Sequence, residues 1–89
     1  MSLPYFAECP DIGQGVVRAM IDTEGRMILM CDEDGTVWLH PDDIGTDRFA
    51  QPSGPDWSLP NGDHVLPGTT RWATLEEIGS VGWTSYLSS

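Results

Sequence analysis

The chain contains no lysine, and its four arginines stand against fourteen aspartates and glutamates, for a formal net charge of -10 at pH 7. A surface of this sign repels phosphate groups, so the composition argues against binding to nucleic acid or to an anionic membrane. It favours rapid association with a basic protein partner, which added salt would weaken. Solubility alone accounts for the same charge balance, because net charge specifies neither a fold nor a partner.

Long apolar runs are also missing. No stretch of about eighteen consecutive apolar residues is present, and the N-terminal segment lacks a basic region followed by an apolar one, so we predict no membrane span and no signal sequence. Only two cysteines are present. That number fits a reducing compartment, where they stay as thiols, bind a metal or take part in redox chemistry rather than staple the fold. We therefore expect a cytoplasmic protein.

Length and hydrophobic content indicate the size of the fold. We expect one domain, residues 1–89, near the length at which a hydrophobic core becomes marginal. Hydrophobic residues make up 39% of the sequence and include four tryptophans, which favours a folded chain with a small core.

Two short β-prone runs predict a β-hairpin. Residues 15–22 (GVVRAMID) and 26–31 (RMILMC) flank the sequence TEG, in which Gly25 can supply the positive φ that a short connection needs. Residues 36–39 (TVWL) follow a second turn, DEDG, and predict a third short strand. Alternation with period two gives the first run an apolar face made by Val17, Ala19 and Ile21.

The second half of the chain predicts a loop and a helix. Prolines and glycines interrupt every candidate element in residues 45–70, so we expect a long loop that is functional, partly ordered against the core, or mobile. A short helix is expected at residues 74–82, because Thr74 and Glu77 match a capping box and Gly82 can end the helix. Its apolar face would be made by Leu75, Ile78 and Val81. The expected fold class is small α+β.

Each cysteine begins a glycine-bearing turn that leads into a β-branched or aromatic run, in ECPDIGQGVV (residues 8–17) and in LMCDEDGTVW (residues 29–38). Cysteine in place of Ile12 and Asp34 would complete the spacing Cys-x2-Cys-x18-Cys-x2-Cys of a four-thiolate zinc site. On this pattern the segment 5–39 resembles the zinc ribbon family, in particular small bacterial proteins with a CPxCGxG knuckle, a β-hairpin and a CDxCxxxW knuckle. The matching residues are Cys9, Pro10, Gly13, Gly15, Cys31, Asp32 and Trp38.

The resemblance implies a zinc-ribbon-like antiparallel β-core and leaves three states open for the cysteine turns. Zinc would be held by Cys9, Cys31 and Asp34, with Asp11 or a histidine as the fourth ligand. A ribbon that has lost its metal would hold its knuckles by packing, which is the interpretation we favour. A Cys9–Cys31 disulfide is the third state, because the two knuckles of a ribbon face each other.

No catalytic motif is present. His40 lies beside PDD and His64 follows NGD, so each imidazole has a carboxylate neighbour in sequence. Neither is accompanied by a serine motif, a phosphate-binding loop or a metalloprotease helix. We interpret both as exposed loop residues and expect no enzyme.

The functional hypothesis is a non-enzymatic module that presents an acidic face to a basic protein, by analogy in size and charge with immunity and antitoxin proteins. Trp57 is expected to face the partner because it lies between prolines in the loop, where packing explains an aromatic least. The alternative is a metal-binding or redox protein that uses Cys9 and Cys31. The predicted contact residues of the favoured hypothesis are Asp32, Glu33, Asp34, Asp42, Asp43 and Trp57.

Overall fold

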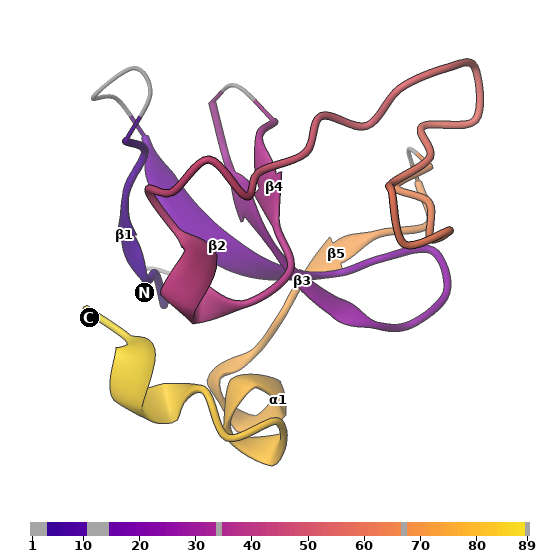
Figure 1. Cartoon of the computed structure of the whole chain (residues 1–89). Helices are drawn as coiled ribbons and strands as arrows, with labels where there is room; N and C mark the ends of the chain where they lie inside the picture. Colours follow the sequence, from indigo (N-terminus) through magenta and orange to yellow (C-terminus); the bar gives the residue numbers. More distant parts are fainter. Residues whose placement is uncertain (1–3, 11–14, 34, 67, 89) are drawn as a thin grey trace.

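The computed structural model of the chain describes residues 4–10, 15–33, 35–66 and 68–88. In these residues a curled antiparallel sheet carries five short strands, and α1 (Leu75–Ser80) is the one α-helix (Figure 1). This confirms the small α+β class. The strands are β1 (Ala7–Glu8), β2 (Val16–Ile21), β3 (Met27–Cys31), β4 (Val37–Trp38) and β5 (Arg71–Trp72), and two short 3-10 helices are η1 (Pro41–Asp43) and η2 (Thr84–Tyr86).

The predicted hairpin and third strand are confirmed. β2 pairs with β3 from Val17↔Cys31 to Ile21↔Met27, and β4 pairs with the other edge of β3. Gly25 has the expected positive φ, 87°. β1 and β5 both pair with the remaining edge of β2 and were not predicted, because two residues are too few to show an alternating pattern.

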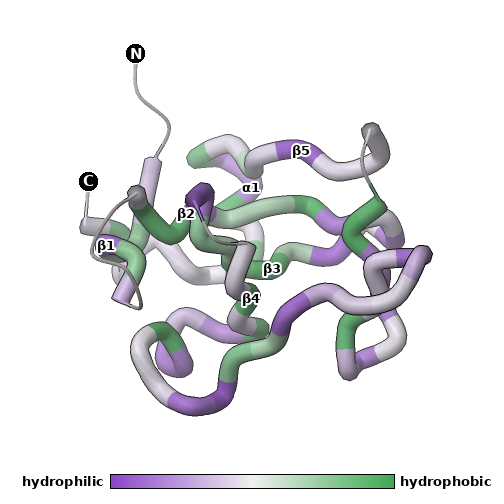
Figure 2. Tube along the Cα trace, turned by 90° about the horizontal axis from the view of Figure 1, so that it is seen from above, coloured by the Kyte–Doolittle hydropathy of each residue, from purple (hydrophilic) through white to green (hydrophobic). Residues whose placement is uncertain are grey.

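The sheet buries apolar side chains on both faces, since successive residues of a strand point to opposite sides. We call the two clusters the helix-side core and the loop-side core. The helix-side core contains Phe6, Cys9, Val17, Ala19, Leu29, Cys31, Trp38, Ala73 and Ile78. The loop-side core contains Met20, Ile28, Val37, Leu59 and Val65. Figure 2 shows the apolar stretches of β2, β3 and β4 in the middle of the molecule.

The helix begins as predicted and ends early. The Thr74 hydroxyl accepts a hydrogen bond from the Glu77 backbone N–H (3.2 Å), and the Glu77 carboxylate accepts one from the Thr74 N–H (2.9 Å), which completes the capping box. The predicted apolar face is wrong, because only Ile78 is buried. Leu75 is exposed although it lies within the six-residue helix, and Val81 is exposed beyond the helix end. Trp83 and Leu87 pack against the helix-side core instead.

The proline-rich segment is ordered against the sheet without forming a helix or strand in the part of residues 45–70 that is described. Isolated bridges join Val37 to Ala50 and Ser58 to both Ser53 and His64. The segment contributes Leu59 and Val65 to the loop-side core. Of the three expectations for this loop, partial ordering against the core is therefore the one observed.

The two ends of the described chain lie together (Figure 1). The Ser88 N–H donates to the Tyr5 carbonyl (3.0 Å), and the Ser88 hydroxyl donates to the Phe6 carbonyl (2.6 Å). These bonds fasten the segment after η2 to the segment before β1, on the same side of the sheet as α1.

Candidate functional site

The two cysteine turns meet in the helix-side core. Cys9 and Cys31 form a disulfide with their Cα atoms 5.7 Å apart, and both residues are buried. Of the three states left open for the cysteine turns, the structure shows the disulfide, whereas packing of the knuckles without a covalent link was the favoured interpretation. The sheet brings the two sulfurs within bonding distance, so the expectation that they stay as thiols is corrected. The bonded sulfurs are not thiolates, so a metal could use them only after reduction. The proposed ligands Asp34 and Asp11, with Ile12 and Gly13 of the first turn, lie outside the described residues.

Close packing holds the second cysteine turn to the start of β2. The Asp32 carboxylate accepts a hydrogen bond from the Val16 N–H (3.0 Å), and its other oxygen lies 3.3 Å from the Nε of Arg18. Gly15 has a φ of 77°, and a Cβ there would collide with the side chains of Asp32 and Glu33. Asp32, a predicted contact residue, therefore has a structural role within the protein.

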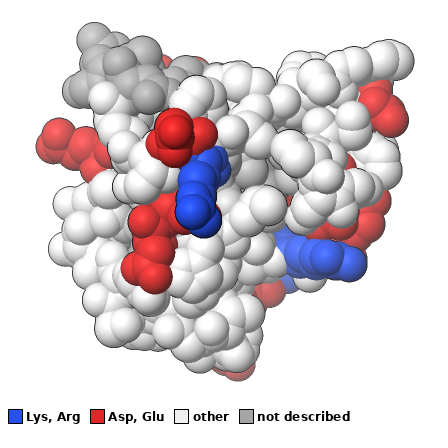
Figure 3. All heavy atoms as spheres, viewed as in Figure 1, with Lys and Arg blue, Asp and Glu red and all other residues white. Residues whose placement is uncertain are grey.

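The other predicted acidic residues lie in different parts of the fold. Glu33 is exposed in the second cysteine turn, whereas Asp42 and Asp43 are in η1. Asp42 is exposed, and its N–H donates to Nδ1 of His40 (3.1 Å). On the face drawn in Figure 3, the carboxylates form separate groups at the left and right with uncharged surface between them and an arginine near each. The acidic residues on this face do not make one continuous patch.

Trp57 lies in the loop as predicted, and the residue is 46% exposed. Its φ of 53° is the one positive value among the described residues other than glycine. Such a conformation costs a bulky residue on the order of 1–3 kcal/mol and persists only where neighbours impose it. Here the Trp57 N–H donates to the Gly54 carbonyl (3.3 Å), and its carbonyl accepts from the Val65 N–H (3.0 Å).

The Trp57 indole borders a cavity of about 260 Å³ on the loop side of the sheet. Met20 of β2 and Met30 of β3 point to this same side of the sheet, and thioether side chains adapt readily to the shape of a guest. The cavity is slightly smaller than typical small-ligand pockets, which begin near roughly 300 Å³. Its lining can accept an apolar side chain. The residues that line it include Met20, Met30, Gln51, Pro52, Trp57 and Val65.

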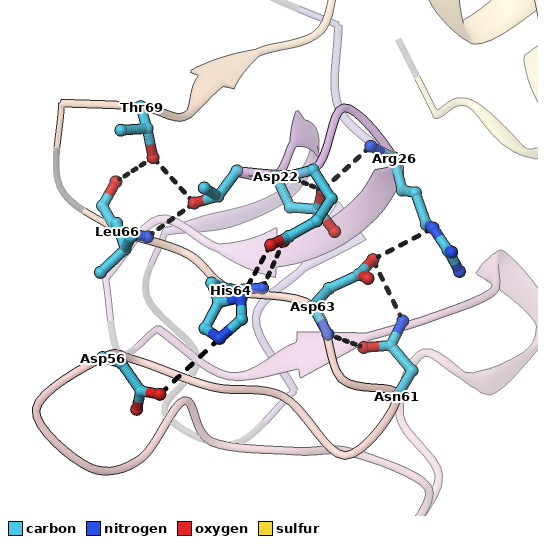
Figure 4. Close-up of polar contacts among 10 residues, drawn as sticks. Asp22, Arg26, Asp56, Asn61, Asp63, His64, Leu66 and Thr69 are labelled. Carbon is cyan, nitrogen blue, oxygen red and sulfur yellow. Dashed lines mark hydrogen bonds and ion pairs between the residues drawn. The ribbon is translucent and has the colours of Figure 1, made fainter.

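Hydrogen bonds from the β2–β3 turn hold the loop in place (Figure 4). The Thr23 N–H donates to the His64 carbonyl (2.9 Å), and the Leu66 N–H donates to the Thr23 hydroxyl (3.0 Å). Nδ1 of His64 lies 2.7 Å from a Glu24 oxygen. This hydrogen bond raises the pKa of His64 and lowers the pKa of Glu24. His40 is exposed as expected, whereas His64 is partly buried and is in contact with Glu24 of the turn.

Two buried carboxyl groups meet beside this contact. Asp22 accepts hydrogen bonds from the N–H groups of Glu24 (3.0 Å) and Arg26 (2.9 Å) through one oxygen. Asp63 lies 3.6 Å from the Nε of Arg26. Burial raises the pKa of Asp22 to about 6, and the neighbouring Asp63 adds to the effect. Neither aspartate was predicted from the sequence as a site residue. They flank the turns TEG and NG, where an exposed aspartate is common, and no local signal shows that the turns meet.

Comparisons with known protein families, curated proteins and solved structures found no match to this chain. The similarity to zinc ribbons therefore stays a prediction. In the part of the chain that the structure describes, no helix has the length and apolar character needed to cross a membrane.

Proposed function

We propose that this protein is a non-enzymatic module that binds a basic protein, in the manner of immunity and antitoxin partners. The observation that carries the proposal is Trp57, an exposed indole held in an unfavourable backbone conformation at the edge of an apolar cavity. Strained backbone outside glycine concentrates at functional positions. Tryptophan is also among the residues most enriched where binding energy is concentrated in protein interfaces.

The cavity suggests what the partner presents. Its apolar lining with two methionines fits an aliphatic or aromatic side chain. Around it lies a protein of net charge -10, which attracts a segment rich in lysine or arginine. The ligand we propose is therefore a basic segment that inserts one apolar side chain beside Trp57.

The acidic residues would act mainly on the rate of association. Groups of carboxylates at separate places steer a basic partner over distance without each one touching it. Asp42 and Asp43 of η1 are suited to this role, since Asp42 is exposed and Asp43 is half-buried beside it. Asp32 is less suited, since its carboxylate is already bonded to Val16 and Arg18.

The test begins with capture of the partner from the source organism at low and high salt, followed by binding kinetics with the purified partner. Trp57→Ala should weaken binding by about thirtyfold or more, mainly through faster dissociation. Asp42→Lys with Asp43→Lys should slow association and flatten its salt dependence. Leu75→Ala, an exposed apolar residue on α1, is the matched control and should bind normally. Unchanged affinity in Trp57→Ala, or association insensitive to salt, would overturn the proposal.

The alternative function, redox or metal chemistry at Cys9 and Cys31, has less support. Reactive cysteines are partly exposed, whereas both of these are 1% exposed in the helix-side core. We retain the cytoplasmic location as part of the proposal, with burial protecting the disulfide from cellular reductants. Alkylation of the folded protein under mild reductant should leave both residues unmodified, and rapid labelling would favour the alternative.

A further inference from the structure

Three carboxylates converge where the β2–β3 turn meets the loop. Asp22, Glu24 and Asp63 each offer one oxygen, and these oxygens lie within 4.8 Å of one another. Asp22 is 1% exposed and Asp63 is 3% exposed, while Glu24 lies at the surface. The two buried members come from segments far apart in the sequence, and Figure 4 shows Asp22 and Asp63 side by side with Arg26.

A second observation concerns the Asp22 oxygen that accepts no hydrogen bond from the N–H groups of the turn. This Oδ2 is buried and has no hydrogen-bond partner among the described residues. A buried, unpaired carboxylate oxygen costs several kcal/mol unless a donor or a cation compensates it. The neighbouring Asp63 can hydrogen-bond to Asp22 only when one of the two carboxyl groups carries a proton. When both groups are ionised, they have no proton to share, and Asp63 compensates Asp22 neither as a donor nor as a cation.

The cationic side chains nearby have other partners. The Nε of Arg26 lies 3.6 Å from an Asp63 oxygen, but the Arg26 side chain is 69% exposed and makes no hydrogen bond to Asp22 Oδ2. His64 is hydrogen-bonded to Glu24 at 2.7 Å. The negative charge of the three carboxylates is therefore larger than the positive charge of the side chains around them.

We propose that Asp22, Glu24 and Asp63 bind one divalent cation, with Ca²⁺ as the preferred ion. A set of carboxylate oxygens suits hard cations, and Ca²⁺ accepts irregular coordination with water in the remaining positions. Mg²⁺ requires nearly ideal octahedral geometry, which ligands from one turn and one loop do not readily supply. The ion would enter past Glu24, compensate Asp22 Oδ2 and join the β2–β3 turn to the loop that bears Trp57. The inference does not depend on the proposed function.

Calorimetric titration of the chelator-treated protein with CaCl₂, repeated with MgCl₂ and MnCl₂, tests this site. We expect one Ca²⁺ per chain, a dissociation constant of roughly 10⁻⁴–10⁻³ M, at the weak end of protein calcium sites, and a melting temperature that rises with CaCl₂ concentration. Asp22→Asn and Asp63→Asn should each weaken binding by about tenfold or more. Asp47→Asn, an exposed carboxylate after η1, is the control and should bind calcium as the unmodified protein does.

Asp22→Asn should still fold, because its amide oxygen can accept the bonds from Glu24 and Arg26. If circular dichroism shows that it does not, Glu24→Gln changes a surface ligand and serves in its place, with the same loss of affinity expected. Absence of saturable binding by the unmodified protein, or equal affinity in the ligand variants, would refute the site. A shared proton between Asp22 and Asp63 would also refute the site. In that case the unmodified protein binds no ion, and Asp22→Asn melts at a higher temperature without calcium, because its amide donates a hydrogen bond to Asp63.

Discussion

The helix-side and loop-side cores are built on the same strands but closed in different ways. On the helix side, α1, the segment after it and the Cys9–Cys31 disulfide cover the sheet. On the loop side, the cover is a chain without helix or strand that reaches the sheet through Leu59 and Val65 and leaves a cavity beside Trp57.

The two faces differ in the hydrogen bonds that hold the covering segment against the sheet. A capped helix satisfies most of its own backbone groups, so it can pack as a unit. The loop depends on bonds from a distant turn, including the one between Glu24 and His64. Regions of this kind open at lower free energy than a core and often carry binding functions. The comparison predicts that the helix side sets global stability and that the loop side opens locally.

The largest loss of stability should follow from truncating a large side chain in the helix-side core. Trp38 is buried on β4, so Trp38→Ala should lower the free energy of unfolding by about 3–5 kcal/mol, measured by urea denaturation. Trp38→Phe is the control and should cost less, because the buried Nε1 has no partner among the described residues and its removal offsets part of the lost packing. Equal losses in both variants would show that the unpaired N–H has no measurable cost.

Loss of the disulfide should rank second. It closes a loop between residues 22 positions apart, so Cys9→Ala with Cys31→Ala should lower the unfolding free energy by about 3 kcal/mol. Urea denaturation of the variant is the measurement, and the unmodified protein under strong reductant should approach the same value. Undiminished stability would mean that the helix-side core closes without this covalent link.

A change in the loop-side core should cost less and act locally. Leu59→Ala should lower stability by about 2 kcal/mol, near the lower end for a buried leucine, because the described residues of the surrounding loop form no helix or strand and can relax around the smaller side chain. Amide exchange should accelerate at Val65 and Ala50 while the helix-side strands stay protected. Leu39→Ala, at an exposed position, should stay within about 0.5 kcal/mol of the original. Uniform acceleration in both cores would refute local opening.

The smallest effect concerns pH and the helix cap. Hydrogen bonds from Arg71 and then from the Thr74 backbone lower the pKa of Glu77 to about 2, from an ordinary value of 4.5. Because the folded-state pKa is depressed, its stabilisation is present above pH 4.5 and is lost as pH falls toward 2. Amide exchange in α1 should rise over that interval. Glu77→Gln should remove most of this dependence, since glutamine can still accept from Thr74, whereas Glu76→Gln should retain it.

Sequence patterns predicted the elements whose signals are local. The hairpin followed from alternation around Gly25, and the start of α1 followed from Thr74 and Glu77. β1 and β5 were too short to predict. The predicted apolar face of α1 was wrong, because the helix ends before Val81 and Leu75 is exposed within it. For the candidate sites, the loop position of Trp57 was expected, but its cavity was not, since the lining comes from separate strands and the loop.

The sequence by itself determined the turns, the capping box, the apolar face of the first hairpin strand and the excess negative charge, because each depends on residue types and short spacings. Only the tertiary structure decided that Cys9 bonds to Cys31 and that Asp22 is buried against Asp63. Both arrangements join segments separated by many residues. Neither segment alone specifies which residue it will contact, because the contact forms only when the whole chain packs.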